Sequence, residues 1–117
     1  MNEWDLEPVL VELMNFRHER DWAQFHRPKE LAAALAIEAA ELQEEFLWRD
    51  PEKATEIKSD SERMLRRRAE AADVAICLLM LVSDLEIPLA TAIKDKMSQN
   101  AEKYPVGEFR GKFRRQG

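Results

Sequence analysis

Apolar residues recur at helical spacing along the first half of the chain. One such pattern predicts a helix over residues 3–20, and a second predicts a helix over residues 28–48, where Pro28 suits the first turn. The first pattern consists of six apolar side chains: Leu6, Val9, Leu10, Leu13, Met14 and Phe16. The second consists of Leu31, Leu35, Leu42 and Phe46, which form a narrow stripe on a helical wheel.

The second half of the chain continues the helical pattern after a break. Asp50-Pro51 interrupts it, and the mixed charges of residues 52–68 are typical of a solvated connector that contains a short helix. A third long helix is predicted over residues 60–85, and Pro88 begins a fourth that ends near residue 103. Strand-like alternation is nearly absent, so we expect an all-α four-helix bundle over residues 1–105, followed by a basic, flexible tail over residues 106–117.

Composition narrows the possible functions. The chain has 117 residues, of which 45% are hydrophobic and 35% charged, and its net charge is −5. A negative protein lacks the basic face that binding to nucleic-acid phosphates requires, so we expect no nucleic-acid partner. No apolar run is long enough to span a membrane, and no secretion signal is recognisable at the start. The single Cys77 cannot form an intrachain disulfide, so we expect a cytoplasmic protein.

Two acidic pairs interrupt the apolar faces. Glu38 falls within the stripe of the second helix, with Glu41 at its edge. Glu70 and Asp73 have the same spacing, and Asp73 opens a run of nine apolar residues, 74–82. Residues three apart share a helical face, and carboxylates directed at an apolar interior are costly unless a cation compensates them. We therefore expect Glu38 and Asp73 to be the more buried members, and the four carboxylates to converge on a metal.

Carboxylate oxygens suit Mg²⁺, or Mn²⁺ in its place, and Mg²⁺ in proteins commonly also binds phosphate oxygens of a substrate. Glu45 lies near the same stripe and is a secondary candidate ligand. A single pair with this spacing is most often a solvated helix edge. Two pairs placed on apolar faces favour a metal site.

Other polar and aromatic residues are candidates for contacts with a nucleotide. Asn100 interrupts the apolar stripe of the fourth helix and Lys96 flanks it; Asn100 either satisfies a backbone group or, with Lys96, meets a phosphate or a base. Trp22 and Trp48 flank the second helix, either as lids of the core or as surfaces on which a base stacks. His26 is a structural residue, an acid or a phosphate donor, and spacing leaves these alternatives open.

Three segments occur in an order that resembles a known family. They are ERDWAQFHRPKELAAALAIEAAELQEEFLW, EAADVAICLL and KMSQNAEKYP. They resemble the MazG-like all-α nucleoside triphosphate pyrophosphohydrolases, and among these the dCTP pyrophosphatase branch. The resemblance implies a MazG-like bundle in a homodimer or homotetramer, whose site lies between helices of neighbouring subunits. It also implies Mg²⁺-dependent cleavage of a nucleoside triphosphate, such as dCTP or a modified dCTP, to the monophosphate and pyrophosphate.

Carried over residue by residue, the resemblance assigns the metal to the two acidic pairs, and Glu41, at the edge of the stripe, is our candidate general base. The residues that it places in the substrate pocket, with His26 nearby, are Trp22, Trp48, Lys96, Asn100 and Tyr104. Two positions depart from the dCTP branch, since Leu13 stands in place of a His and Cys77 in place of a Tyr. Both changes should alter selection of the base.

Three other functions are compatible with the same pattern. The first is a non-catalytic, nucleotide-binding helical oligomer with a regulatory role. The second is a purely structural bundle whose carboxylates bind nothing. The third is a phosphohydrolase of the same fold that acts on a diphosphate or a modified nucleotide. The wide apolar faces in so short a chain favour an oligomer in each case.

Overall fold

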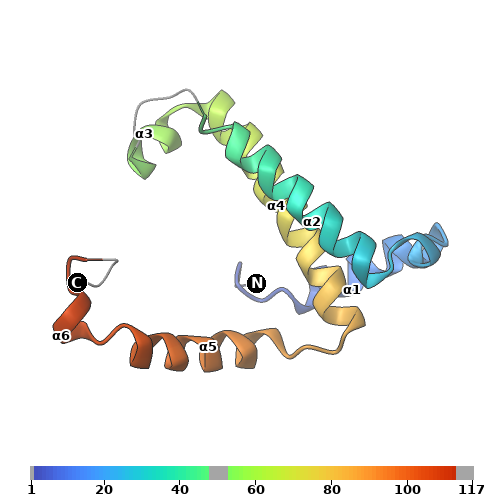
Figure 1. Cartoon of the computed structure of the whole chain (residues 1–117). Helices are drawn as coiled ribbons and strands as arrows, with labels where there is room; N and C mark the ends of the chain where they lie inside the picture. The colour runs from blue at the N-terminus through green and yellow to red at the C-terminus, as the bar shows by residue number, and fades with distance from the viewer. Residues whose placement is uncertain (1, 48–52, 113–117) are drawn as a thin grey trace. The chain divides into compact units, whose positions relative to one another are not determined.

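In the part that the computed structural model describes, residues 2–47 and 53–112, all regular secondary structure is helical and no strand occurs. Its elements are α1 (Glu7–Glu19), the 3₁₀ turn η1 (Ala23–Phe25), α2 (Pro28–Glu44), α3 (Ala54–Ser59), α4 (Ser61–Asp84), α5 (Leu89–Lys103) and α6 (Val106–Phe109) (Figure 1). This confirms the predicted all-α class. Among the described residues, no single helix is long and apolar enough to cross a membrane; only α4 and α5 taken together reach that length and composition.

Local signals in the sequence explain most helix boundaries. Pro28 is the first residue of α2, and Pro88 directly precedes α5. Asp60 caps α4, because its carboxylate accepts a hydrogen bond of 3.1 Å from the backbone N–H of Arg63. The predicted start of the first helix at residue 3 was wrong: α1 begins at Glu7, which places Pro8 in the first turn, where proline fits.

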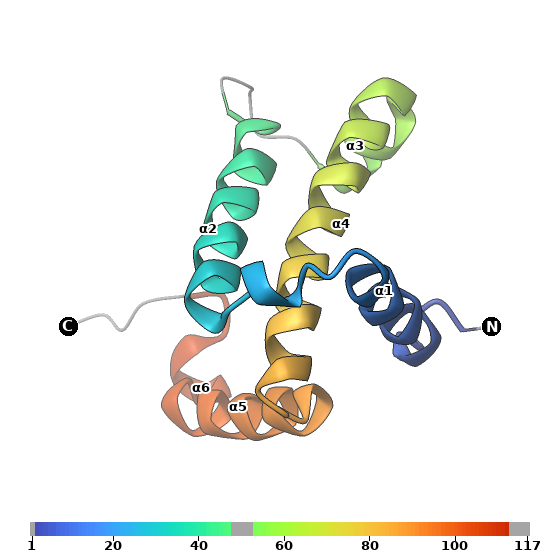
Figure 2. The ribbon, with the colours of Figure 1, turned by 90° about the vertical axis from the view of Figure 1, so that its right-hand side faces the viewer.

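The described chain divides into two compact units, Met1–Leu85 and Glu86–Gly117. In the first unit α2 lies antiparallel along α4, and α1 and α3 also pack on α4. Viewed from the side, α1 and α2 flank α4 on different sides (Figure 2). The second unit contains α5 and α6, where Tyr104 and Phe109 pack edge to face with ring centroids 5.1 Å apart.

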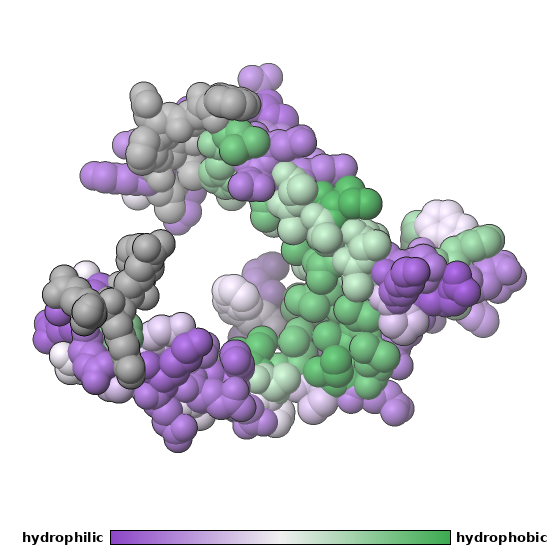
Figure 3. Space-filling model, in the orientation of Figure 1, coloured by the Kyte–Doolittle hydropathy of each residue, from purple (hydrophilic) through white to green (hydrophobic). Residues whose placement is uncertain are grey.

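The buried core of the described residues is small. Four apolar side chains are buried: Leu31 of α2, and Cys77, Met80 and Val82 of α4. Many large apolar side chains remain partly exposed, and apolar surface gathers over α4 and the adjoining part of α2 (Figure 3). Exposed apolar surface of this kind is typical of contact with another protein chain.

A partly buried ion pair fastens α1 to the C-terminal end of α4. The guanidinium of Arg17 donates two hydrogen bonds to the carboxylate of Asp84, of 2.8 and 2.7 Å. Arg17 is buried among the apolar residues of its unit. The hydrogen bonds with Arg17 hold the pKa of Asp84 below its ordinary value. Because this two-pronged pair joins residues far apart in the sequence, it fixes the position of α1 on α4.

Replacing Asp84 by asparagine is expected to lower the free energy of unfolding by roughly 2 kcal/mol, the usual contribution of hydrogen bonds to a charged group. Because the folded pKa of Asp84 is lowered, its contribution is present above the unfolded pKa of about 4 and is lost as the pH falls through the folded value. Urea denaturation at pH 7 and at pH 3 measures this difference. Glu19→Gln is the control, because its ion pair with Arg20 is exposed; equal losses in the two variants would contradict the assignment.

Candidate functional site

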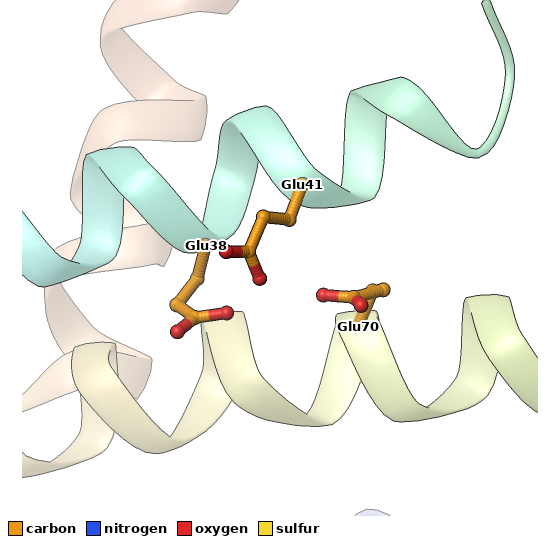
Figure 4. A group of neighbouring side chains, drawn as sticks. All are labelled: Glu38, Glu41 and Glu70. Atoms are coloured by element: carbon orange, nitrogen blue, oxygen red, sulfur yellow. The ribbon is translucent and has the colours of Figure 1, made fainter.

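Three carboxylates converge between α2 and α4. Glu38 and Glu41 project from α2 toward Glu70 of α4, and one oxygen of each lies within 4.8 Å of the others (Figure 4). The i, i+3 spacing aligns the first two on one face of α2, and the antiparallel packing of α4 brings the third against them. The structure therefore brings together three of the four predicted metal ligands.

The carboxylates of this cluster are short of partners. Among the described residues, neither Oε2 of Glu38 nor Oε2 of Glu70 has a hydrogen-bond partner, although both atoms are buried. Burial raises the pKa of Glu38, and the neighbouring Glu41, through a hydrogen bond and its charge, raises it further. Burial also raises the pKa of Glu70, together with the charges of Glu41 and Asp73. The cluster is thus electrostatically unfavourable as it stands, and a cation would relieve it.

The residues present fit a hard divalent cation. All three donors are carboxylate oxygens, the ligands that Mg²⁺ and Mn²⁺ prefer. Ligand oxygens on opposite sides of Mg²⁺ lie about 4 Å apart, so small rotations of these side chains would bring them into range. Glu38 and Glu70 are half-buried and Glu41 is exposed, which leaves the solvent side of the cluster open to water or to phosphate oxygens.

Two predicted ligands lie outside this group. Asp73 is exposed, so the prediction that it is among the more buried carboxylates was wrong, and Glu70 is the more buried member of its pair. Asp73 is still close enough that its charge raises the pKa of Glu38 and of Glu70. Glu45 pairs instead with Arg66, whose Nε lies 3.3 Å from Glu45 Oε2. The site therefore consists of a compact trio, with Asp73 at its side.

An apolar cavity lies between α1 and α4, on the other side of α4 from α2. Its volume is about 650 Å³, which is in the range of sites for small ligands. Leu13 and Phe16 of α1 line one wall, Ile76 and Leu79 of α4 line the opposite wall, and Arg17 also reaches it. Leu13 is one of the two departures from the dCTP branch; Cys77 is buried and does not line this cavity.

Trp22 and His26 close one end of the cavity. Asp21 turns the chain out of α1 with a φ of 51°, a left-handed conformation that aspartate tolerates better than most residues. The indole of Trp22 packs edge to face on Phe16, at 5.7 Å between ring centroids, and on His26, at 6.2 Å. Nδ1 of His26 is buried and lacks a hydrogen-bond partner among the described residues. A flat apolar ligand with a polar edge would suit this end of the cavity.

The cavity and the carboxylate cluster adjoin each other along α4. Ala72 lines the cavity and is two residues from Glu70, so their side chains point to different sides of the helix. Asp73 is the next residue after Ala72, and its side chain points between the side of α4 that carries Glu70 and the side that lines the cavity. The cluster and the cavity therefore lie on neighbouring sides of the same stretch of α4.

The remaining predicted substrate residues lie elsewhere. Lys96 and Asn100 are exposed on α5, and Tyr104 caps its end, with its backbone N–H donating to the carbonyl of Asn100 over 2.8 Å. All three belong to the second unit. Trp48 lies outside the described residues.

Comparison with known proteins identifies the family. The sequence profile of the MazG-like family matches residues 33–113, which include all four predicted ligands. The chain belongs to the MazG-like family. It is 37% identical over 110 residues to dCTP pyrophosphatase 1 of Rattus norvegicus, covering 90% of this chain and 64% of that protein, and 36% identical over 114 residues to dCTP pyrophosphatase 1 of Homo sapiens, covering 93% and 66%.

A solved structure supports the same family. The chain resembles a pyrophosphatase from Archaeoglobus fulgidus with a TM-score of 0.76 and 38% identity, over 90% of this chain and 96% of that one. This confirms the MazG-like fold predicted from the sequence. The chain spans about two thirds of the length of the curated relatives: 64% of the rat protein and 66% of the human protein.

The sequence interpretation missed two ion pairs beside the site, Arg17–Asp84 and Arg66–Glu45. Asp84 shares a helical face with Asp73, and Arg17 follows Leu13 by one turn. Both charges thus lie beside apolar stripes, and this position is the sequence feature that could have indicated that they need partners. Their pairing depends on how the helices are rotated against each other, which the spacing within each helix does not specify.

Proposed function

We propose that this protein is a divalent-metal-dependent nucleoside triphosphate pyrophosphohydrolase. The substrate is a (deoxy)nucleoside triphosphate, of which dCTP and a modified dCTP are two candidates, and it is cleaved to the monophosphate and pyrophosphate. The observation that carries the proposal is the trio Glu38, Glu41 and Glu70, whose unpartnered, buried oxygens suit a cation. The names of the relatives, dCTP pyrophosphatase 1 and pyrophosphatase, support the reaction class.

Mg²⁺ is the proposed cation, with Glu38, Glu41 and Glu70 as ligands and Asp73 as a fourth carboxylate within reach of the bound ion or its water shell. When bound, the cation supplies positive charge that offsets the charge of the triphosphate. Mn²⁺ has the same preference for oxygen ligands and would substitute for Mg²⁺.

The protein's own residues then perform the proton transfer. Glu41 is exposed and borders the solvent side of the cluster, so it is the proposed general base. It accepts one proton from the attacking water while the bond between the α and β phosphates breaks. The water oxygen stays on the monophosphate, and pyrophosphate leaves. Lys96 would offset the charge that develops on the leaving group.

The cavity between α1 and α4 is the proposed pocket for the base. Trp22 offers an aromatic surface for stacking, and His26 offers a buried ring nitrogen for a polar contact. Trp48, Asn100 and Tyr104 are proposed to complete the substrate site. Leu13 lines the cavity where the dCTP branch has a histidine, so the preferred base is expected to differ from that of the branch in the polar groups on its edge.

A homo-oligomer, a dimer or a tetramer, is proposed as the working form. The first unit buries only a few apolar side chains, and apolar residues of α5 such as Ile93 and Met97 are exposed within their unit. A second copy of the chain would cover such surfaces. We also retain the proposed division into a helical domain, residues 1–105, and a basic tail, residues 106–117, and the cytoplasmic location that a buried, free Cys77 favours.

A product assay with a panel of triphosphates tests the function. The purified chain is incubated with MgCl₂ and each of the common ribo- and deoxynucleoside triphosphates and 5-methyl-dCTP, and products are separated by ion-exchange chromatography. We expect monophosphate and pyrophosphate in equal amounts, and no product when EDTA is added. Release of orthophosphate would instead identify a different bond as the one cut. Binding of a nucleotide without any product would favour the regulatory alternative.

A further inference from the structure

Arg66 lies one helical turn from the carboxylate trio, on the side of α4 that faces α2. It precedes Glu70 by four residues on α4, and its partner Glu45 follows Glu41 by four residues, directly after the last residue of α2. Four residues of helix are about 6 Å long, and residues at this spacing share a face. The facing sides of α2 and α4 therefore carry an anionic site with a cationic side chain directly next to it.

The neighbouring Arg67 performs the structural task at this end of α2. Its guanidinium donates a hydrogen bond to the backbone carbonyl of Glu45 and lies 4.2 Å above the ring of Phe46. Arg67 is buried, so it is committed to fastening the C-terminal end of α2 to α4. Arg66 is not needed for that contact.

Arg66 is free to exchange its partner. Its side chain is 48% exposed, and it forms an ion pair of 3.3 Å with Glu45, whose own side chain is 23% exposed. A half-exposed pair of this kind contributes little to stability, so a stronger anion can displace the carboxylate at low cost. A phosphate offers more charge than a carboxylate and matches the planar donors of a guanidinium.

We propose that Arg66 binds the pyrophosphate portion of the substrate and that Glu45 holds Arg66 in place until the phosphates arrive. This rests on the proposed function, which places the triphosphate at Glu38, Glu41 and Glu70. A triphosphate held there by its central oxygens can extend along the seam between α2 and α4, and Arg66 is the cation one turn away toward the C-terminal end of α2. Arg66 thus contacts the leaving group, and Glu45 is a positioning residue.

The test compares Arg66→Gln with Arg68→Gln. Arg68 is exposed on α4 and is only two residues from Glu70, closer along the chain than Arg66, but this spacing points it to a different side of α4 from Glu70, so it controls for the loss of one positive charge near the trio. Calorimetric titration with magnesium pyrophosphate measures binding without any reaction, and steady-state kinetics measure KM, kcat and inhibition by pyrophosphate. We expect Arg66→Gln to weaken pyrophosphate binding about tenfold and to raise KM, as the loss of a charged hydrogen bond does. Arg68→Gln should leave both within about twofold of wild type.

Glu45→Gln supplies a second, opposite readout. Without the carboxylate, Arg66 is available to phosphate, so pyrophosphate should bind more tightly than to wild type. In the double variant with Arg66→Gln this gain should disappear, which shows that it acts through Arg66. A purely structural ion pair would instead lower the Tm in both single variants and leave pyrophosphate binding unchanged.

The outcomes separate this inference from the proposed function. If wild type hydrolyses triphosphates but Arg66→Gln and Arg68→Gln bind pyrophosphate equally well, the role of Arg66 is wrong and the proposed function stands. If wild type binds magnesium pyrophosphate through Arg66 but hydrolyses nothing, the proposed function is wrong and the phosphate site stands. Failure of wild type to bind pyrophosphate at all would overturn the inference.

Discussion

Replacing Glu38 or Glu70 by glutamine is expected to reduce pyrophosphate release about 100-fold or more. Removal even of a residue that only supports a metal ligand commonly costs 10- to 100-fold in affinity or activity, so loss of a ligand should cost at least about that much. The amide retains the size of the side chain but loses its charge, and the remaining carboxylates hold a cation less tightly. The initial rate of pyrophosphate release at saturating MgCl₂ measures the effect.

The same variants should be more stable than wild type when metal is absent. The folded pKa of Glu38 and of Glu70 is raised, so the native state binds protons more tightly than the unfolded chain does. The stability of metal-free wild type should therefore fall as the pH rises from about 4.3, the ordinary value for glutamate, through the raised pKa values. Glu38→Gln removes part of this penalty, and its Tm in EDTA at pH 7.5 should exceed that of wild type.

Addition of Mg²⁺ should make the Tm of wild type higher than that of Glu38→Gln, the reverse of the order expected in EDTA. A ligand that binds only the native state raises its Tm, so MgCl₂ should stabilise wild type and have little effect on Glu38→Gln. Glu44→Gln is the matched control, because Glu44 is an exposed residue of α2 outside the trio and should behave as wild type in every assay. Near-normal turnover in both Glu38→Gln and Glu70→Gln would overturn the metal site. Asp73→Asn, outside the compact trio, should show a smaller loss.

Periodicity and local signals within single helices were enough to predict the long helices and to align Glu38 with Glu41. Pro28, Asp60 and Pro88 mark helix starts because their local chemistry suits those positions, and the structure confirms these starts. Glu38 and Glu41 share a face of α2 because their spacing is local. Both results need no knowledge of how one helix packs on another.

Pairings between helices were harder to predict. Asp73 was expected to be buried because it opens a run of nine apolar residues, but such a run covers the whole circumference of a helix, and α2 contacts only one side of α4. For the same reason the partners of Asp84 and Glu45 were not identified, since Arg17 and Arg66 reach them only in one rotation of the packed helices. The cavity was not predicted for the same reason, because its shape depends on how α1 is positioned against α4.

Replacing Trp22 by alanine is expected to raise KM for the preferred triphosphate about 10- to 100-fold, with a smaller effect on kcat. Stacking of a base on an aromatic side chain contributes about 1–3 kcal/mol when measured by alanine substitution. The base lies away from the bond that is cut. Loss of the stacking contact therefore weakens binding of the ground state and of the transition state equally, and the effect appears mainly in KM. Steady-state kinetics with the best substrate of the panel measure the change.

Two further variants separate stacking from packing. Trp22 also packs on Phe16, so Trp22→Ala removes a structural contact, whereas Trp22→Phe retains a ring there and should recover most of the affinity. Phe25→Ala is the matched control, because Phe25 belongs to η1, is 63% exposed and does not line the cavity. An equal rise in KM in Trp22→Ala and Phe25→Ala would contradict the proposal that the base binds in the cavity. A lower Tm with unchanged KM in Trp22→Ala would assign Trp22 to packing alone, because a residue that only supports α1 contributes to folding and not to recognition of the base.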